Sequence, residues 1–257
     1  MSVPARFAAA PTGIAILLAA CASGNAPGAT ASAVSGSITV FAASSLTNAF
    51  TRIGADFEKA HPGAMVHFNF AGSSTLVAQI QQGAIGDVFA SADQPTMQKL
   101  VDAGLVSGPP SVFARNRLQI VVAAGNPRHI GGLADLSRAG VVVVLCAPAV
   151  PCGRYASQAL HSAAVTVRPA SQETDVKAVV SKVALGEADA GIVYVTDVKA
   201  AGAGVQGVDI PARFNVTADY SIAVLKDSQD VGLARAFIGY VLANGQETLG
   251  SDGFAAP

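Results

Sequence analysis

Residues 37–70 read SITVFAASSLTNAFTRIGADFEKAHPGAMVHFNF, and they hold the first unit of a pattern that recurs along the chain. The β-rich run at 37–43 is followed by apolar residues at helical spacing over 45–59. Apolar and polar residues then alternate over 64–70, as in a half-buried strand. A strand, a helix and a second strand in this order predict a parallel strand pair with a crossover helix.

The same alternation continues toward the C-terminus and predicts an α/β fold with a mostly parallel sheet flanked by helices. Uninterrupted apolar runs such as VVVVLCA are typical of strands that are covered on both faces. Further strands are predicted at 87–92, 117–124, 141–147, near 165–167, 190–195 and 219–226, and further helices at 74–83, 94–103, 152–161, 173–185 and 230–249.

The part of the chain with this pattern is large for a single open sheet. About 220 residues follow position 37, and this length suits two lobes. Because the strands at 117–124 and 219–226 are placed to carry the chain from one lobe to the other, we expect one lobe at 38–116 plus 217–257. The second lobe is expected at 117–216.

The N-terminal residues MSVPARFAAAPTGIAILLAAC have the pattern of an export signal. Their apolar run is shorter than the roughly 20 residues of a membrane span, and small residues close it before Cys21. This ending is similar to a bacterial lipobox, which predicts a lipoprotein signal peptide over 1–20 and a lipid anchor on Cys21 at the outer face of the cell membrane. The alternative is an ordinary signal with an incidental cysteine. Small uncharged residues predict a flexible tether over 21–37.

The composition excludes several classes of protein. Of the 257 residues, 51% are hydrophobic and 13% charged, and the formal net charge is −1, so neither a basic nucleic-acid binder nor a disordered chain fits. Tryptophan is absent and aromatic residues make up 6%, which disfavours a site that stacks sugars or bases. A ligand must therefore be held with few charges and few rings.

Hydroxyl-rich segments stand where strands pass into helices. FAASSLTNAF at 41–50 and FAGSSTLVAQI at 70–80 place serines at helix starts, where the first N–H groups lack intrahelical partners. An anion bound there gains these N–H groups and the positive end of the helix dipole. Helix starts near Cys152 and Val176 and the phenol of Tyr194 add further neutral donors. Serine and threonine also cap helices that bind nothing, so the residues alone leave a structural role open.

Common catalytic motifs are missing from the sequence. It has no Gly-x-Ser-x-Gly elbow, no His-Glu-x-x-His, no P-loop and no Cys-x-x-Cys pair. Local sequence does not position any of the four histidines as the base of a catalytic triad, and no metal-ligand spacing occurs. We therefore expect no enzymatic activity and no cofactor. A serine hydrolase that uses Ser45 or Ser73 is a remote alternative.

Five segments in order resemble the extracytoplasmic molybdate-binding proteins of bacterial ABC transporters: ITVFAASSLTNAF, FAGSSTLVAQI, GDVFASAD, PCGRYASQAL and EADAGIVYVTD. The resemblance spans about Ile38 to Val224. It implies a two-lobed type II periplasmic binding protein with an oxyanion in the cleft between the lobes and a membrane permease as partner. It also implies that the ligand is molybdate or tungstate, so that the metal is bound only as its oxyanion.

The resemblance further implies which residues contact the oxyanion. Matched motif by motif, these are Ser45, Ser73, the backbone N–H groups of Cys152 and Val176, and the hydroxyl of Tyr194, with Ser44, Thr47 and Ser74 as second choices. An unprotonated dianion only accepts hydrogen bonds, so a site made of donors suits it. Hydrogen phosphate would require an acceptor, whereas sulfate, which is also unprotonated, is the alternative ligand for this fold.

Cys152 departs from the pattern expected of the family, in which a small residue, often alanine, stands at this position. After export, Cys146 and Cys152 either form a disulfide or remain two free thiols. A disulfide would rigidify this rim of the site. We expect a monomer that binds no nucleic acid.

Overall fold

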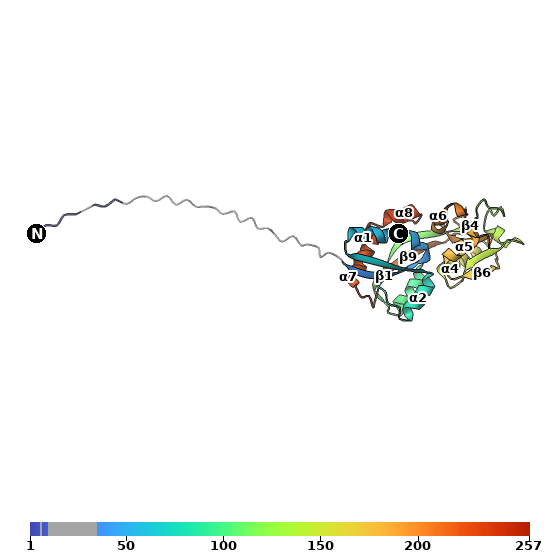
Figure 1. Cartoon of the computed structure of the whole chain (residues 1–257), viewed down its shortest axis with the longest axis horizontal. Coiled ribbons are helices and arrows are strands. Elements are labelled where there is room, and N and C mark those ends of the chain that lie inside the picture. Colours follow the sequence, from blue (N-terminus) through green and yellow to red (C-terminus); the bar gives the residue numbers. More distant parts are fainter. Residues whose placement is uncertain (6, 10–34) are drawn as a thin grey trace. The chain divides into compact units, whose positions relative to one another are not determined.

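A computed structural model of the protein describes residues 1–5, 7–9 and 35–257. The chain divides into two units, Met1–Ser32 and Ala33–Pro257. The described residues of the first unit have no regular secondary structure. Cys21 and most of the predicted leader and tether lie outside the described residues, so these assignments stay predictions. All elements named below belong to the second unit (Figure 1).

The second unit is an α/β fold, as predicted. One half of its sheet has the strand order β2-β1-β3-β9-β4. Its strands are β1 (Gly36–Ala43), β2 (Ala64–Ala71), β3 (Val88–Ser91), β9 (Thr217–Leu225) and the first part of β4 (Val106–Ala123). The helices around this half are α1 (Thr47–Ala60), α2 (Ser73–Gln81), α3 (Gln94–Asp102), α7 (Val231–Ala243) and α8 (Gln246–Asp252), and a short 3-10 helix, η1 (Ser44–Leu46), follows β1.

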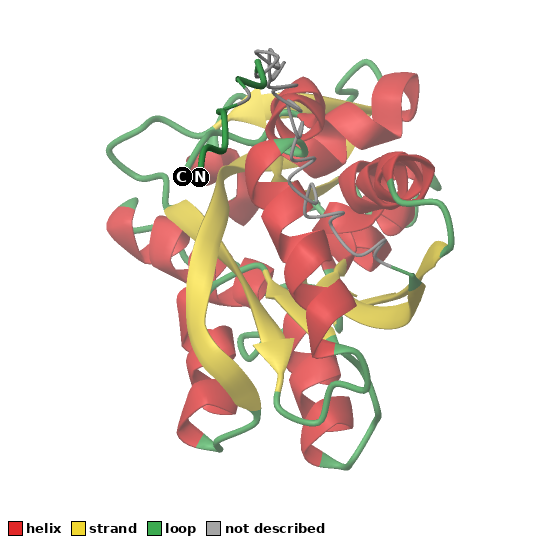
Figure 2. Ribbon diagram, turned by 90° about the vertical axis from the view of Figure 1, so that its left-hand side faces the viewer, coloured by secondary structure: helices red, strands yellow, loops and turns green. Residues whose placement is uncertain are grey.

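The other half continues from β4 in the order β4-β7-β5-β6, and β8 also pairs with β4. Its strands are β5 (Val143–Cys146), β6 (Ser171–Glu173), β7 (Ala190–Tyr194) and β8 (Val205–Asp209). Its helices are α4 (Pro151–Ser162), α5 (Val176–Ala184) and α6 (Val195–Ala201), with 3-10 turns η2 (Leu133–Ser137) and η3 (Gly202–Gly204). Figure 2 shows the helices flanking the strands.

The strand directions are mixed. β1 runs parallel to β2 and β3, and β5 runs parallel to β6 and β7. The two long strands differ, because β9 is antiparallel to β3 and β4, and β4 is antiparallel to β7 and β8. The crossover units predicted from the sequence therefore form the outer parts of the sheet, and antiparallel strands form its middle.

β4 connects the two halves. Its residues up to Arg117 pair with β9, where Arg117 lies opposite Thr217. From Leu118 onward the partner is β7, and Leu118 lies opposite Tyr194. One strand thus carries the chain from one half to the other without a loop.

An aromatic cluster anchors α1, the helix that follows the first serine-rich turn. Phe50 and Phe57 recur at helical spacing and contact Phe237 of α7, with ring centroids 6.1 and 5.4 Å apart. Phe50 also contacts Phe113 of β4 at 5.6 Å. These buried rings hold α1 against the sheet, and they thereby set the position of the turn at its N-terminus.

The strand predicted near 165–167 is wrong. Val165 and Val167 are partly buried and pack against the core, but the segment is not a strand. One face of this segment packs against the core, and this packing produces the apolar–polar alternation although no neighbouring strand pairs with the segment. The edge of the sheet is instead β6, which pairs with β5.

The C-terminal segment also differs from the prediction. The helix expected over 230–249 is two helices, α7 and α8, separated at Asn244 and Gly245. A Cβ atom at Gly245 would lie 2.8 Å from the carbonyl oxygen of Val241, so only glycine fits this turn. β8 is an additional strand, which the sequence pattern did not reveal.

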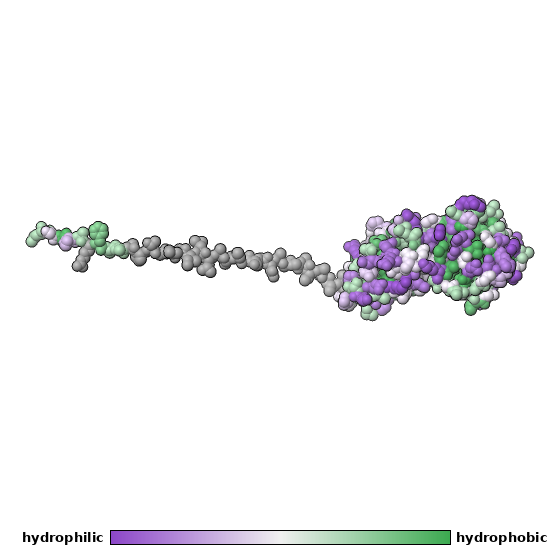
Figure 3. Space-filling model, turned by 90° about the horizontal axis from the view of Figure 1, so that it is seen from above, coloured by the Kyte–Doolittle hydropathy of each residue, from purple (hydrophilic) through white to green (hydrophobic). Residues whose placement is uncertain are grey.

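None of the helices in the described residues is long and apolar enough to cross a membrane. Large exposed apolar side chains are dispersed along the second unit, at Met65, Ile85, Val142, Leu185 and Leu242. Figure 3 shows hydrophilic and apolar residues interspersed over the face that it displays. Such single exposed apolar residues are normal for a folded protein.

Candidate functional site

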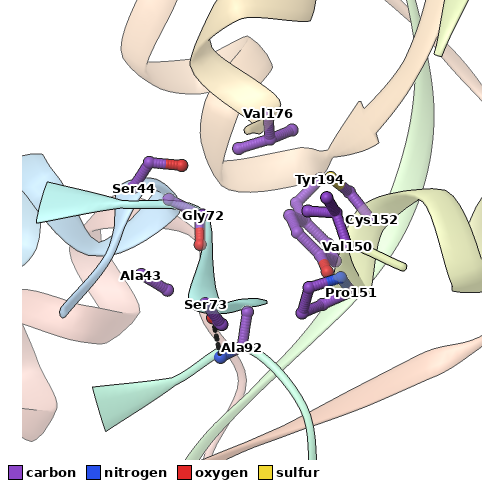
Figure 4. Close-up of a pocket in the computed structure, with 11 residues that line it drawn as sticks. Ala43, Ser44, Gly72, Ser73, Ala92, Val150, Pro151, Cys152, Val176 and Tyr194 are labelled. Carbon is purple, nitrogen blue, oxygen red and sulfur yellow. Dashed lines mark hydrogen bonds between the residues drawn. The ribbon is translucent and has the colours of Figure 1, made fainter. Parts of the chain in front are cut away.

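The five residues singled out as first-choice contacts line one cavity. Ser45, Ser73, Cys152, Val176 and Tyr194 surround it together with Ala43, Ser44, Gly72, Ala92, Val150 and Pro151 (Figure 4). The volume of the cavity is about 10 Å³. The cavity is therefore small, on the order of the 10–15 Å³ that one water molecule needs.

One side of the cavity is formed by the turns after β1 and β2. Ser45 lies in η1, and Ser73 is the first residue of α2, directly after Gly72. The Oγ atom of Ser73 accepts a hydrogen bond from the Ala92 N–H at 3.1 Å. Since this bond uses a lone pair, the hydroxyl proton of Ser73 is left for another acceptor.

The opposite side is formed by the N-termini of α4 and α5. Cys152 and Val176 lie in the first turns of these helices, where backbone N–H groups have no intrahelical acceptor. The Asp175 side chain caps α5 by accepting the Ala178 N–H at 3.1 Å, so it does not take the Val176 N–H. Both helices therefore direct N–H groups and the positive ends of their dipoles toward the cavity.

The loop before α4 is closely packed. A Cβ atom at Gly153 would lie 2.1 Å from the carbonyl oxygen of Ala147, so glycine allows the helix to start beside this loop. Cys146, at the end of β5, and Cys152 are joined by a disulfide, with Cα atoms 5.8 Å apart. The bond links the strand end to the helix start that carries the Cys152 N–H.

Tyr194 provides the only ionisable side chain among the residues that line this cavity in the described part of the chain. The residue is at the end of β7 and is 1% exposed. Its hydroxyl has no hydrogen-bond partner among the described residues. Burial raises the pKa of Tyr194 well above its ordinary value, so the phenol keeps its proton and is a donor. A buried hydroxyl without a partner is unfavourable unless a ligand supplies the acceptor.

The second-choice residues have different positions. Ser44 lines the cavity. Thr47 does not line it, and its Oγ1 donates to the Ser44 carbonyl at 2.6 Å. Ser74 does not line it either, and its Oγ donates to the Ala149 carbonyl at 2.6 Å. Ser74 thus connects the start of α2 with the loop before α4.

Two buried carboxylates adjoin the residues that line the cavity, and each has a cationic partner. Asp93, next to Ala92, is completely buried and forms an ion pair with Arg154 of α4. Asp197 is also buried, and its carboxylate accepts the Tyr194 N–H at 3.1 Å. Burial raises the pKa of Asp197 to about 7, although Lys177 lowers it from 4.0 Å away.

Two buried residues near the site were missed by the sequence pattern. The Tyr220 hydroxyl lies 2.9 Å from the Oγ of Ser45. The Nδ2 of Asn116 lies 3.5 Å from the Tyr220 hydroxyl. Neither stands in a recognisable motif, because only the pairing of β4 with β9 brings them to Ser45. Within the described residues, no group of three or more His, Cys, Asp or Glu side chains could hold a metal ion.

Comparison with known proteins adds a family assignment to this geometry. The family model for bacterial extracellular solute-binding proteins matches residues 38–255. The chain is 45% identical to the molybdate-binding protein ModA of Mycobacterium tuberculosis (strain H37Rv) over 243 residues, which are 93% of each chain.

Solved structures share the fold. The periplasmic molybdate-binding protein of Azotobacter vinelandii superposes with a TM-score of 0.73 at 21% identity, covering 86% of this chain and 99% of that one. The sulfate-binding protein SubI of Mycobacterium tuberculosis superposes with a TM-score of 0.74 at 21% identity, covering 86% of each chain. The same architecture therefore occurs in proteins whose names refer to different tetrahedral oxyanions.

Proposed function

The chain belongs to the bacterial extracellular solute-binding protein family, and from this we propose that it captures molybdate for an ABC importer and delivers it to the membrane permease. The observation that carries the choice of ligand class is the unpartnered Tyr194 hydroxyl in a small cavity lined by neutral donors. The 45% identity to a molybdate-binding protein supports molybdate within that class. Tungstate has the same shape and charge and is expected to bind as well.

The donor set matches the chemistry of the anion. Molybdate is an unprotonated tetrahedral dianion, so each of its oxygens accepts hydrogen bonds and none donates. We propose that Ser45, Ser73, Tyr194 and the N–H groups of Cys152 and Val176 surround it. Charge-assisted hydrogen bonds from neutral groups are strong in a dry site, and they avoid the desolvation penalty of a buried lysine or arginine.

We propose that capture involves closure of two lobes around the anion. One lobe comprises residues 38–116 and 217–257, and the other comprises residues 117–216. Contacts between the two sides of the cavity support this. Gly72 stands so close to Thr174 that an added Cβ would lie 2.2 Å from the Thr174 carbonyl oxygen. Rotation about β4 and β9 would separate these surfaces and open the site, which is a hinge motion.

A role without catalysis fits the partners of the two serines. The Ser45 hydroxyl forms a hydrogen bond with the Tyr220 hydroxyl, and the Oγ of Ser73 accepts a hydrogen bond from the Ala92 N–H. Neither serine is therefore paired with a base. A hydrolase would need such a base within hydrogen-bond reach. Binding and release, without a cofactor, is therefore the proposed activity.

A panel of anions tests the ligand. We expect molybdate and tungstate to raise the melting temperature of the protein, because a ligand that binds only the folded state stabilises it by mass action. Phosphate should have no effect. Stabilisation by sulfate alone would replace molybdate with sulfate as the ligand and leave the oxyanion site in place.

A charge substitution tests the site. Ser73→Asp places a carboxylate against the anion and should abolish binding in calorimetric titration. Thr75→Asp is the matched control, because Thr75 is exposed in the same first turn of α2. Undiminished molybdate affinity in Ser73→Asp would mean that the anion binds elsewhere.

We also propose that the protein is a monomer held at the outer face of the membrane by a lipid on Cys21. The small-residue sequence before this cysteine supports the proposal. Cys21→Ser should release the protein from cells into the medium. Retention of the variant in the membrane fraction would contradict the lipid anchor.

A further inference from the structure

A hydrogen bond between two buried hydroxyls lies directly behind the cavity. The Oγ of Ser45 and the hydroxyl of Tyr220 are 2.9 Å apart, and these residues are 6% and 0% exposed. Either hydroxyl could donate to the other. The direction matters, because Ser45 lines the cavity and has one proton to give, either to Tyr220 or to a ligand.

The amide of Asn116 sets this direction. Its Oδ1 accepts the Arg117 N–H at 2.9 Å, and its Nδ2 donates to Thr196 Oγ1 at 2.9 Å and faces the Tyr220 hydroxyl at 3.5 Å. A backbone N–H requires an acceptor, so the amide oxygen must face Arg117. The NH₂ group must then face Thr196 and Tyr220, and the Tyr220 oxygen receives a donor.

The proton of Tyr220 is consequently directed to Ser45. A phenol oxygen that faces the Asn116 NH₂ group is an acceptor there, and its own proton is free for Ser45 Oγ. Ser45 accepts this proton with a lone pair and keeps its own proton for the cavity. The chain of hydrogen bonds thus runs in one direction, from Asn116 through Tyr220 and Ser45 toward the ligand.

We propose that Asn116 and Tyr220 are positioning residues that orient the Ser45 hydroxyl as a donor into the cavity and thereby select for oxyanions that carry no proton. This inference rests on the proposed function, since it assumes an oxyanion in this cavity. It adds how the Ser45 proton is kept available for the ligand, which molybdate can accept on any of its four oxygens and hydrogen phosphate only on its unprotonated ones.

The fold holds these two residues together. Tyr220 lies opposite Ala114 in the β4–β9 ladder and Asn116 opposite Ala218, so their side chains are diagonal neighbours on one face of the sheet. The Tyr220 ring is held by edge-to-face contacts with Tyr194 and Phe254, with centroids 5.8 and 5.3 Å away. Burial raises the pKa of Tyr220 well above its ordinary value, so its phenol remains protonated.

Asn116→Asp provides the decisive test, because a carboxylate accepts where the amide donates. In this variant Tyr220 donates to the carboxylate, Ser45 donates to Tyr220, and a lone pair of Ser45 faces the cavity. At mildly alkaline pH, where phosphate is also a dianion, we expect molybdate affinity to fall at least about tenfold. The affinity for hydrogen phosphate should stay unchanged or rise, so the molybdate-to-phosphate affinity ratio should fall.

The double variant Asn116→Asp/Tyr220→Phe separates reorientation of the Ser45 hydroxyl from repulsion between the new carboxylate and the anion. Tyr220→Phe keeps the ring in place and cuts the chain of hydrogen bonds, so adding Asn116→Asp in that background should change the affinity ratio much less. If Asn116→Asp alone fails to fold, Tyr220→Phe provides the test, because it frees Ser45 to rotate and should lower the same ratio severalfold. Thermal unfolding of each variant without ligand checks the fold.

The outcomes distinguish the two proposals. An affinity ratio unchanged in both Asn116→Asp and Tyr220→Phe would overturn the orienting role and leave the proposed function standing. A wild-type protein that binds sulfate and not molybdate would overturn the proposed ligand, and the ratio of sulfate to hydrogen phosphate affinity would then test the orienting role. A wild-type protein that binds no oxyanion would overturn both.

Discussion

Arg154 of α4 forms an ion pair with Asp93, whose side chain is completely buried. Asp93 follows the cavity residue Ala92, and Arg154 lies two residues after the cavity residue Cys152. Arg154 also donates to the Ala149 carbonyl at 3.2 Å. The pair therefore joins the two sides of the cavity.

Removing this pair should weaken ligand binding. We expect Arg154→Met to raise the Kd for molybdate about tenfold, or ~1.4 kcal/mol, because closure then buries the Asp93 carboxylate without its cation. Calorimetric titration measures the change. Arg128→Met is the control, since Arg128 is about half exposed in its pair with Asp189 and neither residue lines the cavity. Equal affinities of Arg154→Met and wild type would mean that the pair does not contribute to closure.

The Tyr194 hydroxyl should contribute to affinity and not to folding. Tyr194→Phe removes one charge-assisted hydrogen bond, worth roughly 1.5–3 kcal/mol, so the Kd should rise about 10- to 150-fold. The melting temperature without ligand should stay equal or rise, because an unpartnered buried hydroxyl is lost. Tyr240→Phe, on the partly exposed face of α7, is expected to change neither quantity. A ligand-free melting temperature that drops sharply would indicate a structural role for the hydroxyl.

Gly72→Ala should hold the site open. The added Cβ would meet the Thr174 carbonyl oxygen at 2.2 Å, so the two sides could not approach as closely. We expect at least a tenfold loss of affinity, ~1.4 kcal/mol, with the fold retained. Gly239→Ala on α7 is the control, because no atom lies within 4 Å of its added Cβ, and it should bind normally. Small-angle scattering with and without molybdate would report closure, and normal compaction of Gly72→Ala would contradict this account.

Loss of the disulfide should lower stability more than affinity. Cys146 and Cys152 close a short loop, for which chain entropy gives about 2 kcal/mol, or about 4–8 °C in melting temperature for a chain of this size. The proposed ligand contact of Cys152 is its backbone N–H, so the double variant Cys146→Ala/Cys152→Ala should keep most of its affinity. Denaturant unfolding with and without a reducing agent measures the effect. A wild-type protein insensitive to reductant would contradict the expected contribution.

The buried Asp197 predicts a pH dependence of stability. Burial raises its pKa in the folded state from 3.8 to about 7, so the folded protein keeps a proton that the unfolded chain has lost. The free energy of unfolding should therefore be highest below the ordinary pKa and should decrease as the pH rises to about 7, by at most ~1.4 kcal/mol per pH unit. Asp197→Asn keeps an acceptor for the Tyr194 N–H and removes the titration, so its stability should vary less. Identical pH profiles from denaturant unfolding would rule Asp197 out as their source.

Local patterns were sufficient for the α/β class and the order of most elements, and the family resemblance pointed to the five neutral donors that line the cavity. Apolar spacing depends on residues that are close in sequence, and Ser45, Ser73 and Val176 lie at helix starts that this spacing marks. The same local reasoning failed at 165–167, where alternation comes from packing against the core and not from strand pairing. It also could not reveal β8, since a strand exists only with its partner.

The size of the cavity, the lack of a partner for the Tyr194 hydroxyl and the link from Asn116 through Tyr220 to Ser45 emerge only in three dimensions. Ser45 and Tyr220 are 175 positions apart, and the register of β9 against β4 brings them together. Few charges and many small residues predict a ligand that needs only donors. Which hydroxyls keep a free proton depends on what each oxygen already accepts, and distant segments supply those partners.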